Sequence, residues 1–361
     1  MKASAFSIYI LVAIILNSEA FARWATFDEA QCICTIDTET FAIKKDGTSV
    51  SEYQHAFIVN TESARQKLKA LEIDYDSSVE TARVVEASVT NGKNKTLISK
   101  NFIADESDSS SENGMDKTRI IKIALPNVIV GSVIQYKVQV ARYRPVLNGV
   151  FNGTFNLGRV ATLKGAGLRI RSELPLQYRV YGPQGLIITK EKKLKDSYEY
   201  EFTLTRDSYF KTTNESPHPN WFAEPEHPLI QVTSLKNWSD LIGRIQPRVE
   251  KELSASVPEK YERIVSNARS QKAFAERIDA LTTGIHENLR YFGDWRSVDA
   301  YHFPRSLRET AELGYGDCKD FALTLAKLAR ALGYKAHVAL IYSGEPDFKP
   351  RELPMTTHDN P

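Results

Sequence analysis

The chain has 361 residues, of which 42% are hydrophobic and 25% charged, and its formal net charge at pH 7 is +2. This is the composition of a globular protein with ample core material, and at this length two domains are expected rather than one. Because basic and acidic residues are interspersed, the sequence excludes a nucleic-acid-binding stripe and a polybasic membrane patch.

Residues 1–22 have the three parts of a secretory signal peptide. Lys2 supplies the positive start, an apolar run extends from Ile8 to Leu16, and Ala20-Phe21-Ala22 forms a small-x-small cleavage site. The apolar run is too short to cross a bilayer, and no later stretch approaches 18 uninterrupted apolar residues. We therefore expect an exported protein, periplasmic or secreted, with no integral membrane segment after cleavage.

Residues 23–210 predict an antiparallel β-sandwich domain. The segment 118–143 contains two runs of alternating apolar and polar residues, separated by Pro126 and Gly131. Alternation at period two is typical of half-buried strands, and many short strands with turn residues between them favour a sandwich. Further strands are expected at 168–171, 178–181 and 198–205, and one helix at 62–71.

The cysteine count is odd, with Cys32, Cys34 and Cys318. In an oxidising compartment at least one thiol is then left without a partner. Cys32 and Cys34 are poorly placed for a mutual disulfide in an extended strand, and no neighbouring residues complete a metal site. We expect them to be small apolar strand residues, or to pair with something outside this chain. Cys318 is the remaining thiol.

Residues 211–234 predict an interdomain linker, because 211–228 holds four prolines and no periodicity. His218 and His227 in this segment, together with the earlier His55, match no metal motif, and we interpret all three as solvent-facing loop residues.

From residue 235 the apolar period changes to about 3.6, which predicts helices within 235–253 and 271–289. In the second helix, Phe274, Ile278, Leu281 and Ile285 share one face. His286 and Glu287 are interpreted as helix surface.

The segment 316–333, GDCKDFALTLAKLARALG, predicts a helix that begins at Cys318. Asp317 is the expected N-cap, Asp320 occupies the third helical position, and Gly333 ends the helix. Apolar residues recur on the face that Cys318 shares, so the thiol is expected to point toward the interior.

A cysteine at a helix start can act as a nucleophile, because free amides and the helix dipole stabilise a thiolate there. Gly314 and Gly316 would let a substrate backbone approach and leave amides for an oxyanion. The flanking carboxylates oppose a thiolate, so a histidine partner would be needed. The alternative is a buried cysteine that merely starts a core helix.

The stretch GYGDCKDFALTLAKLARALGYKAHVALIY, residues 314–342, resembles the bacterial transglutaminase-like superfamily, whose members share a papain-like cysteine-protease fold. The resemblance extends back through FPRSLRETAEL to about residue 285. Upstream, IALPNVIVGSVIQYKVQV resembles the uncharacterised β-rich domain that often precedes this module in exported bacterial proteins. The implied fold class is α+β, with the sandwich followed by a transglutaminase-like domain at 235–361 that we expect to be truncated at its C-terminus.

The resemblance also implies site residues. Cys318 is the nucleophile, a histidine on a later strand is its base, and an aspartate orients that base. His337 lies on the expected strand 335–342, one element too early. His358 is the candidate in LPMTTHDNP, but Asp-Asn-Pro follows it and interrupts a strand, so the base is expected beyond Pro361. Lys319 stands where the better-known transglutaminases carry tryptophan, which puts protein crosslinking in doubt.

The function expected from these observations is an exported acyl transferase or amide hydrolase that forms a thioester at Cys318. Its substrates would be peptide, protein or cell-wall amides, and no cofactor, metal or nucleic acid is implied. A non-catalytic binding or scaffold protein that keeps this fold is the alternative. A redox protein using Cys32 and Cys34 is disfavoured, because they lack Cys-x-x-Cys spacing.

Overall fold

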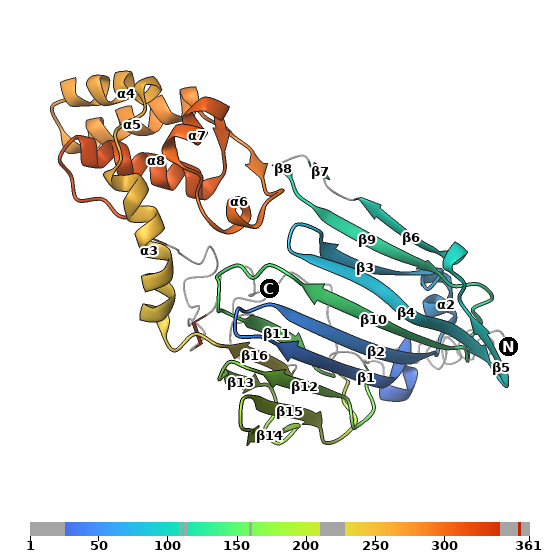
Figure 1. Ribbon diagram of the computed structural model, residues 1–361. Helices are drawn as coiled ribbons and strands as arrows, with labels where there is room; N and C mark the ends of the chain where they lie inside the picture. The colour runs from blue at the N-terminus through green and yellow to red at the C-terminus, as the bar shows by residue number, and fades with distance from the viewer. Residues whose placement is uncertain are drawn as a thin grey trace, which may run out of the picture.

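The structure is a computed structural model that describes residues 26–107, 110–111, 114–158, 161–209, 228–339 and 353–354. Strands fill the described chain up to residue 233, and helices predominate after residue 238 (Figure 1). This arrangement confirms the predicted α+β class. The predicted signal peptide, most of the predicted linker and His358 lie outside the described residues.

The strand-rich region is built on one wide sheet of eight strands in the order β14-β15-β12-β1-β2-β10-β4-β5. Alternating residues place one face of each strand inward, as the sequence pattern predicts. The strands of this sheet are β1 (Cys32–Ile43), β2 (Ser49–Val59), β4 (Glu80–Asn91), β5 (Asn94–Leu97), β10 (Val133–Arg142), β12 (Gly167–Ser172), β14 (Ile187–Lys193) and β15 (Tyr198–Leu204).

One pairing in the wide sheet departs from the antiparallel prediction. β1 and β12 run parallel, whereas the other neighbours in the sheet are antiparallel. A parallel pair needs a long crossover, and here the chain between Ile43 and Gly167 supplies it. Short-range alternation specifies strands but not which distant strand lies beside them, so this pairing could not be read from the pattern.

Two three-stranded sheets supply the remaining core. The first contains β3 (Ala70–Asp76), β9 (Thr118–Ala124) and β6 (Ile103–Ser107), and the second contains β11 (Asn152–Asn156), β16 (Leu229–Thr233) and β13 (Gln177–Tyr181). The core beneath the first sheet includes Ile123 and Ile134, and the core beneath the second includes Ile170, Phe202 and Ile230. The wide sheet therefore carries two separate cores.

The second small sheet corrects the linker prediction. Leu229–Thr233 is β16, which pairs with β11 and β13 and is buried at all five positions. A strand that is buried on both faces lacks the alternation of apolar and polar residues that identifies other strands. This strand also directly follows a proline-rich stretch, so the sequence pattern does not separate it from the linker. The last part of the predicted linker is therefore a central core strand.

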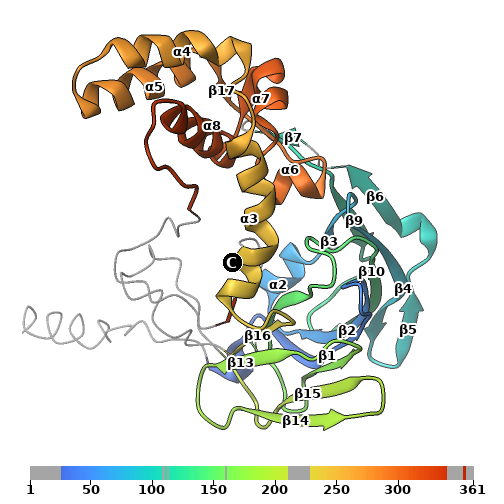
Figure 2. The same cartoon turned by 60° about the vertical axis from the view of Figure 1, so that its left-hand side comes forward.

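The helices after β16 form a separate cluster (Figure 2). Helix α5 lies within the predicted range 271–289, and α3 extends one residue beyond the predicted range 235–253. Helices α4, α5 and α8 share a core around Tyr261 and Leu328. The helices are α2 (Glu62–Lys67) in the strand-rich region, then α3 (Trp238–Ser254), α4 (Glu259–Ser270), α5 (Phe274–Asn288), α6 (Val298–His302), α7 (Leu307–Leu313) and α8 (Cys318–Ala331). Within the described ranges, no helix has the length and apolar character needed to cross a membrane.

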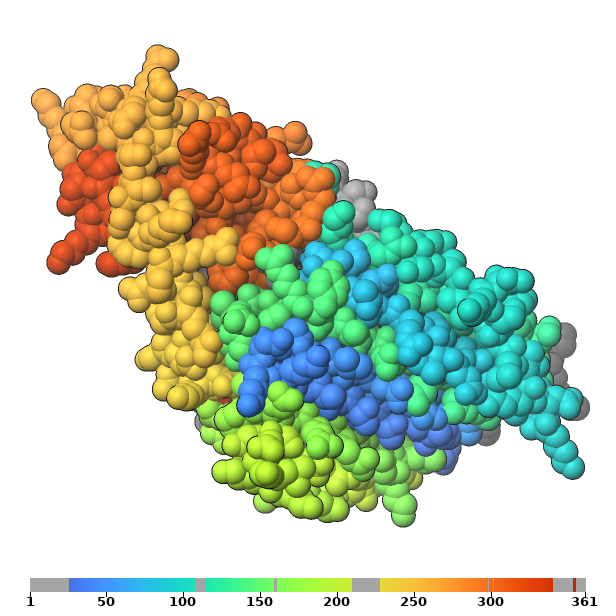
Figure 3. All heavy atoms as spheres, viewed as in Figure 1, coloured from blue at the N-terminus to red at the C-terminus, as the bar shows by residue number. Residues whose placement is uncertain are grey.

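The helical cluster contacts the strand-rich region through β18, α6 and α3 (Figure 3). The short strand β18 (Gly293–Asp294) pairs in parallel with β8 (Gly114–Met115), which itself pairs with β7 (Ser110–Ser111). Asp299 of α6 binds both Arg144, at 2.8 Å, and Arg248, at 3.1 Å. A backbone ladder and a shared carboxylate thus connect the two regions beside the segment that leads to α7.

Replacing Ile230 with alanine tests whether β16 is part of the core. The Ile230 side chain is fully buried, so Ile230→Ala should lower the free energy of unfolding by about 2–5 kcal/mol through lost burial and cavity formation. The control is Ile188→Ala in β14, where the side chain is 47% exposed and the cost should stay below about 1 kcal/mol. Urea unfolding measures both, and equal losses would contradict the core assignment.

Candidate active site at the start of helix α8

Helix α8 begins as the sequence predicts, with Cys318 as its first residue and Asp317 as its N-cap. The Asp317 carboxylate accepts a hydrogen bond from the main-chain N–H of Lys319 at 3.2 Å. In return, the Asp320 carboxylate accepts one from the Asp317 N–H at 3.1 Å. This reciprocal capping box satisfies amides that would otherwise lack partners and fixes the point at which the helix starts.

The Cys318 side chain is exposed, so the expectation that it points into the interior is wrong. The buried face of α8 instead comprises Asp320, Leu323, Thr324, Ala326, Leu328 and Ala329. Two of these residues, Asp320 and Thr324, are polar, and the apolar pattern does not predict that they are buried. Their burial is tolerated because their polar atoms are satisfied, as when the Thr324 hydroxyl donates to the Asp320 carbonyl at 2.8 Å.

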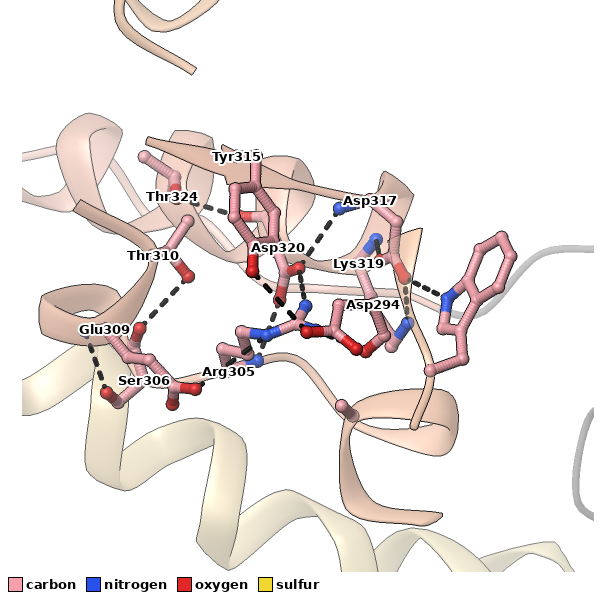
Figure 4. Close-up of polar contacts among 12 residues, drawn as sticks. Asp294, Arg305, Ser306, Glu309, Thr310, Tyr315, Asp317, Lys319, Asp320 and Thr324 are labelled. Atoms are coloured by element: carbon pink, nitrogen blue, oxygen red, sulfur yellow. Dashed lines mark hydrogen bonds and ion pairs between the residues drawn. The ribbon is translucent and has the colours of Figure 1, made fainter. Parts of the chain in front are cut away.

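Asp320 is held by a buried arginine from the segment before α7 (Figure 4). Its carboxylate accepts hydrogen bonds from the Arg305 main-chain N–H at 2.7 Å and from the Arg305 guanidinium at 2.8 Å. The guanidinium also donates to the Asp294 carbonyl. Arg305 is 5% exposed and Asp320 1% exposed. Charges this deeply buried need a partner of opposite charge, and here the guanidinium and the carboxylate are partners to each other.

Asp317, the other carboxylate beside Cys318, is also compensated. One of its oxygens accepts a hydrogen bond from the indole N–H of Trp295 at 2.7 Å and also contacts the Lys319 ammonium. From the sequence, the two flanking carboxylates are expected to oppose a thiolate at Cys318. Because Lys319 and Arg305 neutralise them, that opposition is reduced.

The two glycines before Cys318 have structural roles that differ from the expected ones. Gly314 ends α7 in the left-handed region, with φ of +70°, where a side chain would be strained. Gly316 lies against Asp320, and a Cβ there would come within 2.7 Å of the Asp320 Cβ. Gly316 is therefore required for the buried carboxylate to fit.

Tyr291 lies beside the thiol because β17 (Arg290–Tyr291) pairs in parallel with β19 (Tyr315–Gly316), the strand just before the α8 cap. The Tyr291 hydroxyl is close enough to Cys318 for the side chain and backbone of Cys318 to affect its pKa. Desolvation first, and then the charges of Cys318 and Asp317, raise the pKa of Tyr291. The ring is 56% exposed, so an incoming group can reach this hydroxyl.

Sequence reasoning missed Tyr291, Trp295 and Arg305. All three lie between α5 and α7, Tyr291 in the two-residue strand β17 and the other two in connecting segments, so no periodic pattern marks them. The spacing of the cysteine motif contains no signal that would identify them, because each reaches the start of α8 through folding rather than through proximity in the chain.

The candidate histidines are not assembled around Cys318. His358 lies outside the described residues, and His337 is exposed. No strand is assigned at 335–339, the described part of the predicted strand 335–342. His286 is exposed on α5, as expected for helix surface, and its ring centroid lies 5.2 Å from that of Phe321.

Among the residues that the structure describes, no histidine is hydrogen-bonded to Cys318, and no group of three or more His, Cys, Asp or Glu is arranged to hold a metal ion.

Comparisons with known families agree with this geometry. Residues 259–353, which include Cys318, match the model of the transglutaminase-like superfamily. This match assigns residues 259–353 to that superfamily. Residues 45–207 match a domain of unknown function with a solved structure, DUF3857, so the transglutaminase-like domain follows a β-rich domain as the sequence resemblance predicts. A search of the curated proteins found no match.

Among solved structures, the chain is similar to a crystal structure of a "putative protease" from Parabacteroides distasonis, with a TM-score of 0.65 and 14% identity. The match covers 84% of this chain and 59% of the other, so the chain spans less than two thirds of that structure. At this identity the likeness shows the fold alone.

Two further matches are too weak to support a shared fold. An M1 zinc metallopeptidase from Deinococcus radiodurans has a TM-score of 0.28 and 9% identity, and the match covers 56% of this chain and 42% of the other. Yeast LTA4 hydrolase has a TM-score of 0.30 and 8% identity, and the match covers 89% of this chain and 47% of the other.

Replacing Gly316 with alanine tests the packing at the start of α8. The added Cβ would displace the Asp320 carboxylate, so Gly316→Ala should destabilise the protein by about 1–3 kcal/mol. The control is Gly243→Ala on the exposed face of α3, where no atom lies within 4 Å of the added Cβ. That variant should gain about 0.5–1 kcal/mol from helix propensity. Thermal and urea unfolding report both, and a neutral Gly316→Ala would refute the packing requirement.

Proposed function

We propose that the protein is an exported, cysteine-dependent acyl transferase or amide hydrolase that acts through a thioester at Cys318. The observation that carries the proposal is an exposed thiol on the first residue of α8, within the segment that matches the transglutaminase-like superfamily. Export is supported by the signal-peptide pattern of residues 1–22.

The proposed chemistry begins with attack of the Cys318 thiolate on an amide carbonyl carbon. A C–S bond forms, and the oxyanion accepts hydrogen bonds at the start of α8, where the Cys318 N–H and the Tyr291 hydroxyl lie together. The C–N bond then breaks as the leaving amine takes the proton that a base removed from the Cys318 thiol. The acyl thioester passes to water in a hydrolase or to an amine in a transferase.

The surroundings of Cys318 support this chemistry in two ways. The carboxylates that flank the thiol are paired with Lys319 and Arg305, so they add little net negative charge against a thiolate. The main-chain amides and the dipole of α8 favour negative charge at its first residue. A histidine base is the group that this chemistry still needs.

A non-catalytic scaffold is the second candidate function. It is favoured by one observation, that none of the described histidines is hydrogen-bonded to Cys318. In either case the ligands would be peptide, protein or cell-wall amides, which the domain would hold near the start of α8.

Alkylation separates the two candidates. At pH 6.5 we expect iodoacetamide to modify Cys318 at least about tenfold faster than it modifies N-acetylcysteine, because the thiolate is the reactive form. The two other thiols are internal references. Burial raises the pKa of Cys32, and burial together with the charge of Asp37 raises the pKa of Cys34 to about 12, so both should react slowly. Peptide mapping by mass spectrometry identifies the modified residue.

Cys318→Ser is the control and should abolish the fast phase without changing the thermal unfolding temperature, because the side chain is exposed. A rate for Cys318 no greater than that of N-acetylcysteine would reject the enzyme and leave the scaffold. A fast rate combined with an acyl adduct at Cys318, seen by intact mass after incubation with peptide amides, would establish the thioester.

A further inference from the structure

A second group of titratable side chains lies on the wide sheet, far along the chain from Cys318. Asp37 pairs with His55 across β1 and β2, Glu39 pairs with Tyr53, and His55 pairs with Tyr136 of β10. Residues paired across strands point to the same face, as do residues two apart in one strand. All five side chains, here called the central cluster, therefore point to one face of the sheet.

That face is the one that carries both cores. Phe41, two residues beyond Glu39, packs against the core that contains Ile170. Phe57, two residues beyond His55, packs against the core that contains Ile134. The central cluster thus occupies the polar strip between two apolar regions, and its side chains reach solvent, with 17% exposure for Asp37 and 29% for His55.

The aromatic members of the cluster are in contact. The His55 ring stacks on Tyr136 at 5.3 Å and meets Tyr53 edge-on at 5.5 Å. His55 also pairs with Asp37 at 3.4 Å. From the sequence alone, His55 is interpreted as a solvent-facing loop residue. That interpretation is wrong, because His55 lies in β2, half-buried, and contacts Asp37 of β1, Tyr136 of β10 and Tyr53 of its own strand.

Glu39 differs from its neighbours because it lacks a partner. Within the described part of the chain, no donor hydrogen-bonds to its carboxylate and no cation pairs with it. Burial, reinforced by the charge of Asp37, raises the pKa of Glu39 to about 7. A half-buried carboxylate without a donor weakens the fold, and groups that weaken a fold are common at binding sites.

The electrostatic surroundings are acidic. The pKa of Tyr53 is raised, first by burial and then by the charges of nearby groups that include Tyr136, Glu39, Glu80 and Asp74. The guanidinium of Arg142 is engaged by Glu80 at 3.4 Å. An unpaired carboxylate beside aromatic rings, in a region of negative potential, favours a cation.

We propose that the central cluster binds a primary ammonium group, such as a lysine side chain of a protein or the end of a free diamine. The Glu39 carboxylate accepts hydrogen bonds from the ammonium, and Asp37 adds negative charge. The rings of Tyr53 and Tyr136 contact the cation and its alkyl chain. The site lies in the β-rich domain and is independent of the chemistry proposed for Cys318.

Binding should depend on pH in a defined direction. Below pH 7 Glu39 is largely protonated, so the ammonium must compete with a proton, whereas at pH 8 the carboxylate is free. Burial lowers the pKa of His55 and the charge of Asp37 opposes this shift, while burial raises the pKa of Asp37. His55 is therefore predominantly neutral at pH 8 and does not repel the ammonium. Affinity should rise between pH 6 and pH 8.

Isothermal titration calorimetry with cadaverine tests the proposal. The protein is the full chain carrying Cys318→Ala, which silences the candidate nucleophile. We expect the protein with an intact Glu39 to bind cadaverine saturably at pH 8. The affinity should be at least about tenfold lower when Glu39→Gln is added at pH 8, and also when Glu39 is intact but the pH is 6. The matched control is Glu52→Gln, which removes a carboxylate from the opposite face of the same sheet, where it pairs with Lys137 at 2.7 Å, and should leave the affinity unchanged.

Two further arms sharpen the result. 1,5-Pentanediol has the same chain length without charge and should not bind. A peptide with one free lysine, compared with its acetylated form, distinguishes a protein lysine from a free diamine as the source of the ammonium. No binding of cadaverine at pH 8, equal binding to Glu39→Gln, or equal binding of the diol would overturn the proposal.

Stability provides the folding control. The folded-state pKa of Glu39 lies above its ordinary value, so the wild-type protein loses stability as pH rises through 7. Glu39→Gln should therefore unfold at a higher temperature than wild type at pH 8 and at a similar temperature at pH 4. If this variant does not fold, Asp37→Asn with the same titration is the second test, with weaker binding expected and unchanged affinity contradicting the site.

Discussion

The buried contact between Arg305 and Asp320 fixes the geometry on which the candidate site depends. Asp320 receives the Arg305 guanidinium and also the N–H of Asp317, so one carboxylate joins the segment before α7 to the cap of α8. Removing one partner of such a pair typically costs about 3–5 kcal/mol, because the other charge is left buried. The position of Cys318 follows from this contact, since the thiol is on the first residue after the cap.

The same contact accounts for most of the motif around the cysteine. Gly316 has no side chain because Asp320 occupies that space. Asp317 caps the helix, Lys319 compensates its charge, and Trp295 donates a hydrogen bond to it. The motif therefore describes how a helix start is built around two carboxylates. Any catalytic use of Cys318 rests on that construction, because it leaves the thiol exposed with its neighbouring charges already paired.

Local rules made part of this structure predictable. The start of α8 at Cys318 follows from a capping box, and β9, β10, β12, β13 and β15 follow from alternation at period two. The contributions of Arg305, Trp295 and Tyr291 depend on which distant segments pack together, which spacing does not encode. The same limit applies to His55. Its place in β2 beside Asp37 depends on register between strands, and a search for metal-ligand spacing could not detect it.

The position of β16 in the chain has a consequence for biogenesis. This strand is the centre of a sheet whose other members, β11 and β13, precede it by about fifty residues or more, and five residues after it the chain enters α3. During synthesis the amino-terminal half therefore stays open on one side until residue 233 has emerged from the ribosome. Apolar side chains such as Ile170 and Phe202 are uncovered during that interval. A chain that closes its core this late has to keep these side chains from associating with other chains until β16 is in place.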